Sequence, residues 1–266
     1  MKKVVFPVLC CFALLINCSK GGDITSSPDT NANLKAGNLL STGASARDLL
    51  SNDTFDKLLI EIDYVNGFAP TAGAIANFEE FLRARTFKED IEFKYTALSS
   101  PNEETLTLDE IVDLEKENRD EYNNGSTLAI HIYFADAPAD SDEEDENLVT
   151  LGAVYRNTSM VIYESTVKDI ASRSTAITTE DVETATILHE FGHLFGLINL
   201  STESVNDHED SESDNHCNVD GCLMRAELEF GASLLKEMKR NTSKGLAAVP
   251  SLGPECLLDV KKYGGR

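Results

Sequence analysis

Two histidines and a glutamate in the stretch 187–197 have the types and spacing needed for hydrolytic chemistry. His189, Glu190 and His193 form the pattern His-Glu-x-x-His, and Gly196 follows three residues later. On a helix, residues four apart share a face, so both imidazoles can hold one ion. Neutral imidazole is a zinc ligand, and a carboxylate beside it can take a proton from water and return it to a leaving amine. The spacing therefore predicts a zinc-dependent peptidase site on a helix.

The third ligand of this site is displaced along the chain. In the extended motif a third histidine lies three residues after the glycine. That position is Asn199 here, and asparagine is a poor zinc ligand by type. The next histidines are His208 and His216. We favour His216 because of the residues that follow it, and His208 is the alternative.

His216 opens a segment that reads His-Cys-x4-Cys-x-Met and ends at Met224. With the helix motif, this segment resembles the metzincin clan of zinc metalloproteases, and most closely the archaemetzincins, interrupted by a polar insertion over 199–215. The resemblance covers about residues 187–224. It implies a zinc-dependent endopeptidase that acts on peptides or proteins.

The resemblance also assigns roles to single residues. One catalytic Zn²⁺ would be held by His189, His193 and His216, with Glu190 as the general base. Met224 would be the methionine of the turn beneath the metal. By analogy with the clan, the stretch 152–154 is the candidate rim along which a substrate would pair by its main chain.

Three cysteines follow the helix motif: Cys217, Cys222 and Cys256. In archaemetzincins the equivalents of the first two help to bind a second, structural zinc together with further cysteines downstream. The downstream Cys-x-x-Cys pair is absent here. We therefore predict a disulfide between Cys217 and Cys222, as is common in an oxidising compartment, and a free Cys256.

The amino terminus is typical of an export signal. Lys2 and Lys3 precede an apolar stretch over 4–16 that is too short for a comfortable membrane span. Cys18 follows it in a context that resembles a bacterial lipoprotein signal, although Asn17 departs from the usual small residue. We predict a signal peptide over 1–17, a lipid anchor on Cys18 and a place in the bacterial cell envelope. Ordinary secretion is the alternative.

Composition limits the classes of partner. The chain of 266 residues has a formal charge of −23. Removal of 1–17 takes away two lysines and leaves 21 basic and 46 acidic side chains, a charge of −25. Such a surface repels nucleic acid, so DNA or RNA binding is not expected. The acidic loop 136–147 raises the option of Ca²⁺, but a solvated loop is the simpler interpretation because its spacing matches no EF-hand.

Hydrophobic periodicity predicts alternating strands and helices, and hence an α/β (α+β) fold with a mixed, mainly parallel sheet, an active-site helix and a C-terminal helical subdomain. Residues 18–52 read as a flexible tether, and 53–266 as one metzincin-like domain, expected to be a monomer. The predicted strands are 57–65, 91–95, 127–134, 148–155 and 159–163, and the predicted helices are 71–85, one starting at 107, one starting near 178, 226–240 and 255–263.

Two other functions compete with the peptidase. A non-catalytic zinc-binding envelope lipoprotein, acting as an adhesin or accessory binding module, is kept open by Asn199 and the bulky insertion. The presence of Glu190 argues against it, because a structural zinc site closes with a fourth protein ligand. A calcium-dependent envelope protein with a degenerate protease fold is the third hypothesis.

Overall fold

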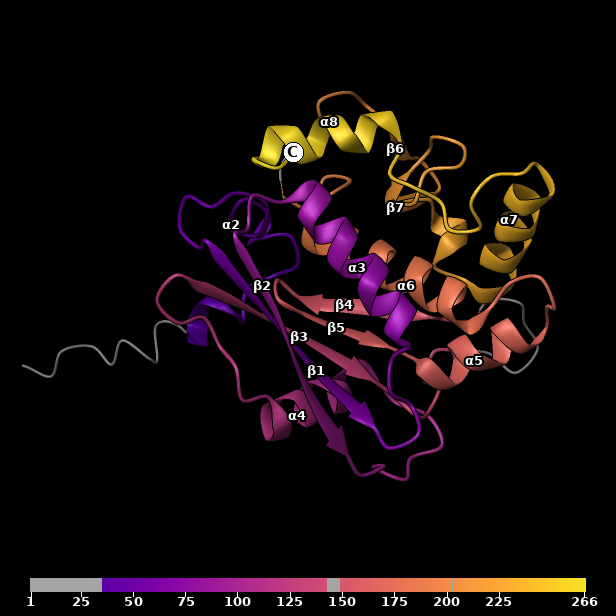
Figure 1. Ribbon diagram of the computed structural model, residues 1–266, viewed down its shortest axis with the longest axis horizontal. Coiled ribbons are helices and arrows are strands. Elements are labelled where there is room, and N and C mark those ends of the chain that lie inside the picture. Colours follow the sequence, from indigo (N-terminus) through magenta and orange to yellow (C-terminus); the bar gives the residue numbers. More distant parts are fainter. Residues whose placement is uncertain (1–34, 143–148, 202) are drawn as a thin grey trace, which may run out of the picture.

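The computed structural model describes residues 35–142, 149–201 and 203–266. Its centre is a five-stranded sheet in the order β2-β1-β3-β5-β4 (Figure 1). The first four strands run parallel, and β4 pairs antiparallel with β5 at one edge. The strands are β1 (Lys57–Val65), β2 (Asp90–Leu98), β3 (Thr127–Phe134), β4 (Gly152–Arg156) and β5 (Ser159–Ile162). The predicted fold class, a mixed α/β domain with a mainly parallel sheet, is confirmed.

Helices cover both faces of this sheet, as crossover connections between parallel strands require. On one face α3 (Ala72–Arg85) packs against α6 (Thr179–Leu194), where the rings of Phe78 and Phe191 meet edge to face at 4.9 Å. On the other face lies α4 (Leu108–Asn118) (Figure 1). The main core therefore lies between the sheet and α6, the helix that carries the histidine motif.

Local sequence signals fix where the predicted helices begin. Thr107 and Glu110 form a capping box at the start of α4, and Thr178 and Asp181 form one at the start of α6. Gly196 follows α6 with a φ of +75°, the left-handed conformation that ends a helix. The remaining helices are α2 (Ala46–Leu50), α5 (Glu164–Ser172), the 3-10 turn η1 (Ala226–Leu228), α7 (Gly231–Ser243) and α8 (Pro254–Tyr263).

Two parts of the helix prediction need correction. The segment predicted as one helix over 226–240 is divided at Phe230, which has an extended backbone between η1 and α7. Helix α5 is unpredicted. It buries one face, with Val167 and Ile170, and its nine residues begin just after β5, so the short segment has no separate start signal.

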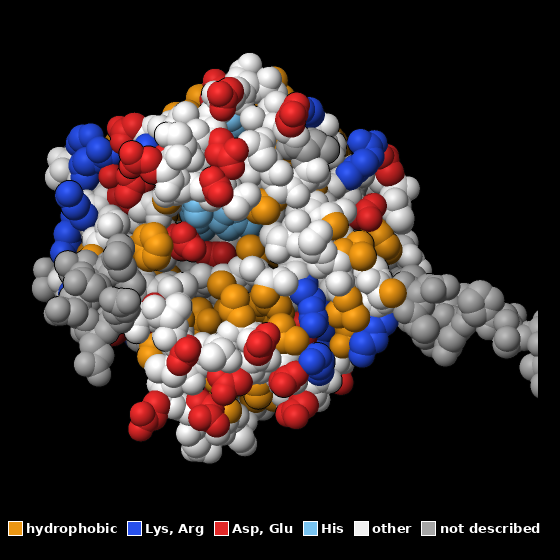
Figure 2. All heavy atoms as spheres, turned by 180° about the vertical axis from the view of Figure 1, so that it is seen from behind, with side chains coloured by type: hydrophobic (Ala, Val, Ile, Leu, Met, Phe, Trp, Pro, Cys, Tyr) orange, Lys and Arg blue, Asp and Glu red, His pale blue; other side chains and the backbone are white. Residues whose placement is uncertain are grey.

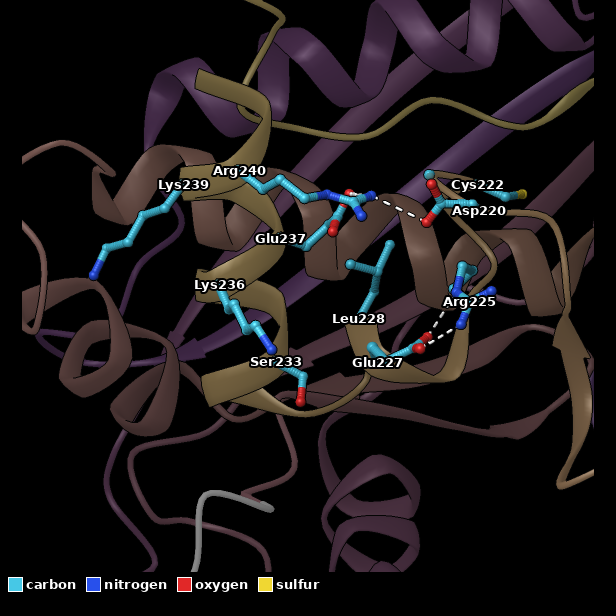
Figure 3. A pocket seen from close by; sticks show the side chains of 11 residues that line it. Asp220, Cys222, Arg225, Glu227, Leu228, Ser233, Lys236, Glu237, Lys239 and Arg240 are labelled. Atoms are coloured by element: carbon cyan, nitrogen blue, oxygen red, sulfur yellow. Dashed lines mark hydrogen bonds and ion pairs between the residues drawn. The ribbon is translucent and has the colours of Figure 1, made fainter. Parts of the chain in front are cut away.

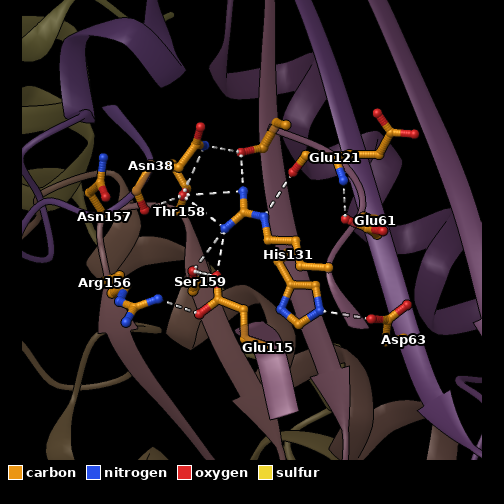
Figure 4. Close-up of polar contacts among 12 residues, drawn as sticks. Asn38, Glu61, Asp63, Glu115, Glu121, His131, Arg156, Asn157, Thr158 and Ser159 are labelled. Atoms are coloured by element: carbon orange, nitrogen blue, oxygen red, sulfur yellow. Dashed lines mark hydrogen bonds and ion pairs between the residues drawn. The ribbon is translucent and has the colours of Figure 1, made fainter. Parts of the chain in front are cut away.

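The predicted tether is wrong from residue 35 onward. Asn38 is fully buried, and its side-chain amide donates to the main-chain oxygen of Ala129 at 2.8 Å and to Asn123 at 2.9 Å (Figure 4). Leu49 and Leu50 lie in the main core. Residues 35–52 are therefore part of the folded domain, whereas the predicted signal and Cys18 lie outside the described residues.

A buried polar network lies on the α4 side of the sheet (Figure 4). Arg119 donates to Glu115 at 2.7 Å, and Arg156 donates to the other oxygen of Glu115 at 2.8 Å. His131 lies 3.0 Å from Asp63 in the same layer. The histidine in the third strand thus takes part in a structural network, and it is remote from the helix motif.

Within the described ranges, every helix is too short or too polar to cross a membrane.

Candidate functional site

Three histidines from two parts of the chain converge beside β4. His189 and His193 lie on successive turns of α6, and His216 lies on β7 (Ser213–Cys217), the second strand of a small hairpin with β6 (Glu209–Asp210). One ligand atom from each lies within 4.8 Å of the others, and all three residues are buried. The structure therefore brings together the three histidines that the resemblance implies as ligands.

The spacing of the imidazoles fits a tetrahedral ion. The Nε2 atoms of His189 and His193 lie 3.2 Å apart. Zn–N bonds of about 2.1 Å at tetrahedral angles separate two ligand nitrogens by about 3.4 Å. In His189 and His216 the Nδ1 atoms lie within hydrogen-bond distance of the main-chain oxygens of Leu223 (2.8 Å) and Asp214 (2.9 Å). Donation from Nδ1 fixes the tautomer and leaves the Nε2 lone pairs facing one another, ready for a cation.

The protein environment keeps the imidazoles of His189 and His193 neutral. Burial lowers the pKa of His189 to about 4, with a further contribution from His216. Burial, with His189 and His216 as neighbours, holds the pKa of His193 well below its usual value. A neutral imidazole is the form that binds a metal, so the donor set fits zinc.

Glu190 lies between α6 and the edge strand. It is 3% exposed, and burial raises the pKa of its carboxyl well above the usual value, with a further contribution from Glu229. A dication bound nearby would favour the carboxylate and oppose this shift. Gly152 makes the close approach to β4 possible, because a Cβ there would lie 2.8 Å from the Cγ of Glu190 and 3.1 Å from the main-chain oxygen of Val161.

Replacing Gly152 with alanine is expected to slow peptide hydrolysis by about 10–100-fold, since a displacement of about 1 Å at a reacting group can have an effect of this size. The main-chain oxygen of Val161 cannot give way, so Glu190 must move. The measurement is kcat with zinc content determined on the same sample. Bound zinc should be unchanged, and an unchanged kcat would show that Glu190 needs no such approach.

Met224 lies beneath the motif helix. It is fully buried, and its sulfur occupies the space that a Cβ on Gly192 would fill. The main-chain oxygen of Met224 accepts from the N–H of Cys217 at 2.6 Å. The turn around Met224 thus connects the helix that carries two histidines to the strand that carries the third.

Glu229 is a site residue that the sequence did not reveal. Its Oε2 lies 3.4 Å from the Nε2 of His216, and burial raises the pKa of its carboxyl while His216 lowers it. Glu229 follows η1, and no motif marks it, because its place depends on how the chain turns after Arg225. It gives the site a second carboxylate beside Glu190.

The site opens to the surface in a cleft of about 250 Å³. Figure 2 shows histidine side chains in a hollow, with acidic side chains beside them. The lining residues include no lysine or arginine; they are Thr42, Ala153, Val154, Glu190, His193, Leu200, Asp214, Asn215, His216 and Glu229. The candidate rim residues Ala153 and Val154 thus line the same cleft as Glu190.

Asn199 lies away from this donor group. Its side-chain amide donates to Glu209 at 2.5 Å, and its oxygen accepts from the N–H of Ser204 at 2.9 Å. It has a φ of +66°, so it turns the chain at the start of the insertion. The insertion then folds back as the β6–β7 hairpin and carries His216 to the motif helix.

His208, the alternative third ligand, belongs to a second cluster. Its Nδ1 lies 3.3 Å from the sulfur of Cys217, and the sulfurs of Cys222 and Cys256 lie 3.5 Å apart. The donor atoms of His208, Cys217 and Cys256 all lie within 4.8 Å of one another. All four residues are buried. Zn–S bonds of about 2.3 Å place two sulfurs about 3.8 Å apart, so His208, Cys217 and Cys256 are close enough to share one zinc, and Cys222, beside Cys256, is the candidate fourth donor.

The surroundings of this second cluster support metal binding. The Nε2 of His208 lies 2.8 Å from the carboxylate of Asp259, which directs the proton to Nε2 and leaves Nδ1 free toward the sulfurs. Hydrogen bonding from Cys217, then from Cys256, lowers the pKa of Cys222, whereas hydrogen bonding within the same cluster raises the pKa of Cys217 and of Cys256. The N–H of Gly253 also donates to the sulfur of Cys222, at 3.2 Å. Such donors stabilise a thiolate, the form that binds zinc.

The predicted disulfide between Cys217 and Cys222 is therefore corrected. Both cysteines are free thiols in the structure, and so is Cys256, as predicted, which lies against Cys222. The residues that contact these two cysteines, His208 and Cys256, come from distant parts of the chain, the insertion and α8. A short turn between two cysteines gives no sign of either.

A separate cavity of about 490 Å³ lies between the turn 220–228 and α7, with Cys222 in its wall (Figure 3). Arg240 pairs there with Asp220 at 3.1 Å and with Glu237 at 2.6 Å. Arg225 pairs with Glu227. None of the three converging histidines lines it, and both of its arginines form ion pairs with acidic side chains of the chain.

A buried carboxyl at the start of α5 gives a pH-dependent prediction. Glu164 is fully buried, and burial, then the neighbouring Glu183, raises its pKa to about 9. The folded state holds this proton from about pH 4.5 to 9, whereas the unfolded state releases it, so this group lowers stability by roughly 1 kcal/mol per pH unit as the pH rises through that window. The contribution is fully present below pH 4.5 and is lost by pH 9.

Replacing Glu164 with glutamine should remove that dependence. We expect the difference in unfolding free energy between Glu164→Gln and the parent chain to grow by a few kcal/mol from pH 5 to pH 8, measured by denaturant unfolding. The exposed Glu117→Gln is the control. Parallel pH profiles for the parent and Glu164→Gln would contradict the assignment.

Comparisons with known proteins identify no family. No family model matches the sequence, and no curated protein matches it. Thirteen chains of solved structures match the fold. One is the crystal structure of archaemetzincin from Methanopyrus kandleri, with a TM-score of 0.48 and 14% identity, covering 78% of this chain and 96% of that chain. The function is therefore inferred from the residues of this chain.

Proposed function

We propose that this protein is a zinc-dependent peptidase that hydrolyses peptide bonds internally, as an endopeptidase. The observation that carries the proposal is the convergence of three buried histidines beside Glu190 at the open edge of a sheet. His189, His193 and His216 would hold one zinc and leave a coordination position free. A structural zinc site would instead close with a fourth protein ligand.

Zinc and Glu190 would have separate roles in hydrolysis. Zinc, when bound, supplies Lewis-acid polarisation and lowers the pKa of water to near neutral. Glu190 takes a proton from the attacking water and later gives it to the leaving nitrogen. Its position beside Gly152 aims the carboxylate at the edge of β4.

The edge strand offers the substrate a binding surface. Within the described residues, the N–H groups of Gly152 to Arg156 form no main-chain hydrogen bonds outside the sheet. An extended peptide can pair with such an edge, its main chain giving affinity and its side chains specificity.

We also propose that His208, Cys217, Cys222 and Cys256 bind a second, structural zinc. Four protein donors would close the tetrahedron and leave no position for substrate. Cys217 follows His216 directly on β7, so this ion would fix the strand that carries a ligand of the first site.

The experiment for the proposed function is hydrolysis of a mixed peptide library before and after metal removal. A chelator should abolish cleavage, and added zinc should restore it. A protein that binds zinc with all its sites filled, yet cleaves no peptide, would favour the binding-module alternative.

The amino-terminal sequence is the basis for a proposal on where the protein is located. We propose export to the bacterial envelope, anchoring through a lipid on Cys18, and a monomeric state. Incorporation of labelled fatty acid into the full chain, and not into Cys18→Ala, is the expected result. Equal labelling of both would refute the anchor.

A further inference from the structure

One end of the cleft is crossed by a segment from the amino-terminal part of the domain, residues 38–46, which we call the strap. The N–H of Leu40 donates to the side chain of Asn157 at 2.9 Å, and the N–H of Asn157 donates to the main-chain oxygen of Leu40 at 3.1 Å. Asn157 directly follows β4. The strap therefore starts at the far end of the edge strand, and further on its Thr42 lines the cleft together with Val154.

Beyond Thr42 the strap meets the chain that follows α6. Gly43 has a φ of +79°, and a Cβ there would lie 2.6 Å from the main-chain oxygen of Leu200. Leu200 itself lines the cleft. A Cβ on Gly196 would likewise lie 2.8 Å from the Cβ of Ala46. These contacts join the strap to the opposite rim and leave no room for a peptide to pass between Gly43 and Leu200.

The strap is held firmly in this place. The side-chain amide of Asn157 donates to the main-chain oxygen of Gly37 and to the hydroxyl of Ser45, both at 2.7 Å. Asn38 is fully buried, and its main-chain oxygen accepts from the hydroxyl of Thr158 at 3.0 Å. Contacts on both sides of Thr42 thus hold this residue in the wall of the cleft.

The strap lies close to the catalytic centre. Gly152 is level with Glu190, and Val154, two residues along β4, already shares the cleft with Thr42. A strand advances about 3.3 Å per residue, so a peptide paired with β4 has space for only about two or three residues on this side of Glu190.

The direction of strand pairing determines which end of the peptide meets the strap. Antiparallel pairing is the more stable arrangement, and it places the amino end of the substrate at the carboxyl end of β4, where the strap lies.

We infer that the strap closes the substrate cleft at one end, so that the protein cuts peptides about two or three residues from a free amino terminus. This inference rests on the proposed peptidase function and narrows it from internal cleavage to cleavage near one chain end. Thr42 is the residue that sets the depth of the closed end.

The test is to map cut positions in linear random peptides of about twelve residues with the zinc-loaded full chain, by mass spectrometry. Cuts should cluster within about three residues of the amino end, and extending a good substrate at that end should slow its cleavage by about tenfold or more. Cuts spread along the peptides, or clustered at the carboxyl end, would overturn the inference. Failure to cut any peptide would instead refute the proposed function.

Variants of Thr42 give a second measurement that does not depend on the folded fraction. The readout is the ratio of cleavage rates for the unextended and extended peptides in one sample. Thr42→Gly should reduce this ratio about threefold or more, and Thr42→Phe should increase it. Ser41→Phe is the matched control, because Ser41 is exposed and does not line the cleft. Equal ratios in Thr42→Gly, Thr42→Phe and the parent would overturn the role of Thr42.

Discussion

Glu190→Gln is expected to lower kcat for peptide hydrolysis by about 10²–10⁴-fold, the range that a general base contributes. Glutamine keeps the size of the side chain and its place beside Gly152 but cannot take a proton from water. The three histidines are unchanged, so zinc should remain bound. The measurement is kcat on a peptide that the parent chain cleaves, with zinc content determined in parallel.

The control for this variant lies on the same helix. Glu180 is exposed at the start of α6, and Glu180→Gln should keep the activity of the parent chain. If Glu190→Gln retained full activity with zinc bound, a different group would have to act as the base. Loss of zinc together with activity would leave the proton-transfer role unsupported, because a damaged site would explain the result.

Cys256→Ser is expected to destabilise the domain by at least about 3 kcal/mol and to release one zinc. Structural zinc contributes on the order of 10 kcal/mol of apparent binding free energy in small domains, and this binding is coupled to folding. The variant removes one of four buried donors and leaves a hydroxyl, a much weaker zinc ligand than a thiolate. Denaturant unfolding and zinc content are the measurements.

Leu258→Ser tests whether this loss is specific to the metal. Leu258 lies on the same helix and is 40% exposed, so the variant should keep both zinc ions and most of the stability. Thiol reactivity provides a further check, because zinc-bound thiolates should be protected until a chelator is added. A disulfide between Cys217 and Cys222 in the purified protein would contradict the second site and restore the pairing predicted from the sequence.

Local signals in the sequence predicted the framework well. The capping boxes at Thr107 and Thr178 fixed two helix starts, and the left-handed Gly196 marked the end of the motif helix. The apolar runs of β1 and β3 are buried on both faces, as expected of central parallel strands. Each of these features depends on residues close together in the chain.

The features that were missed depend on contacts between distant residues. His208 meets Cys256 and Asp259, about fifty positions later, and Asn38 contacts Thr158 across 120 positions. A polar, serine-rich stretch before Asp53 reads as a tether unless these partners are known. The need for glycine at position 152 likewise becomes visible only when Glu190 is seen to lie against it.

The central claim is that His189, His193 and His216 hold the zinc that acts in hydrolysis. Zinc content per folded chain, measured with peptide cleavage in the parent, His216→Ala and His208→Ala, tests it most directly. We predict about two zinc ions in the parent and about one in each variant, with cleavage lost in His216→Ala and retained per folded chain in His208→Ala. Full zinc content and full cleavage in His216→Ala, with cleavage lost in His208→Ala, would contradict the assignment.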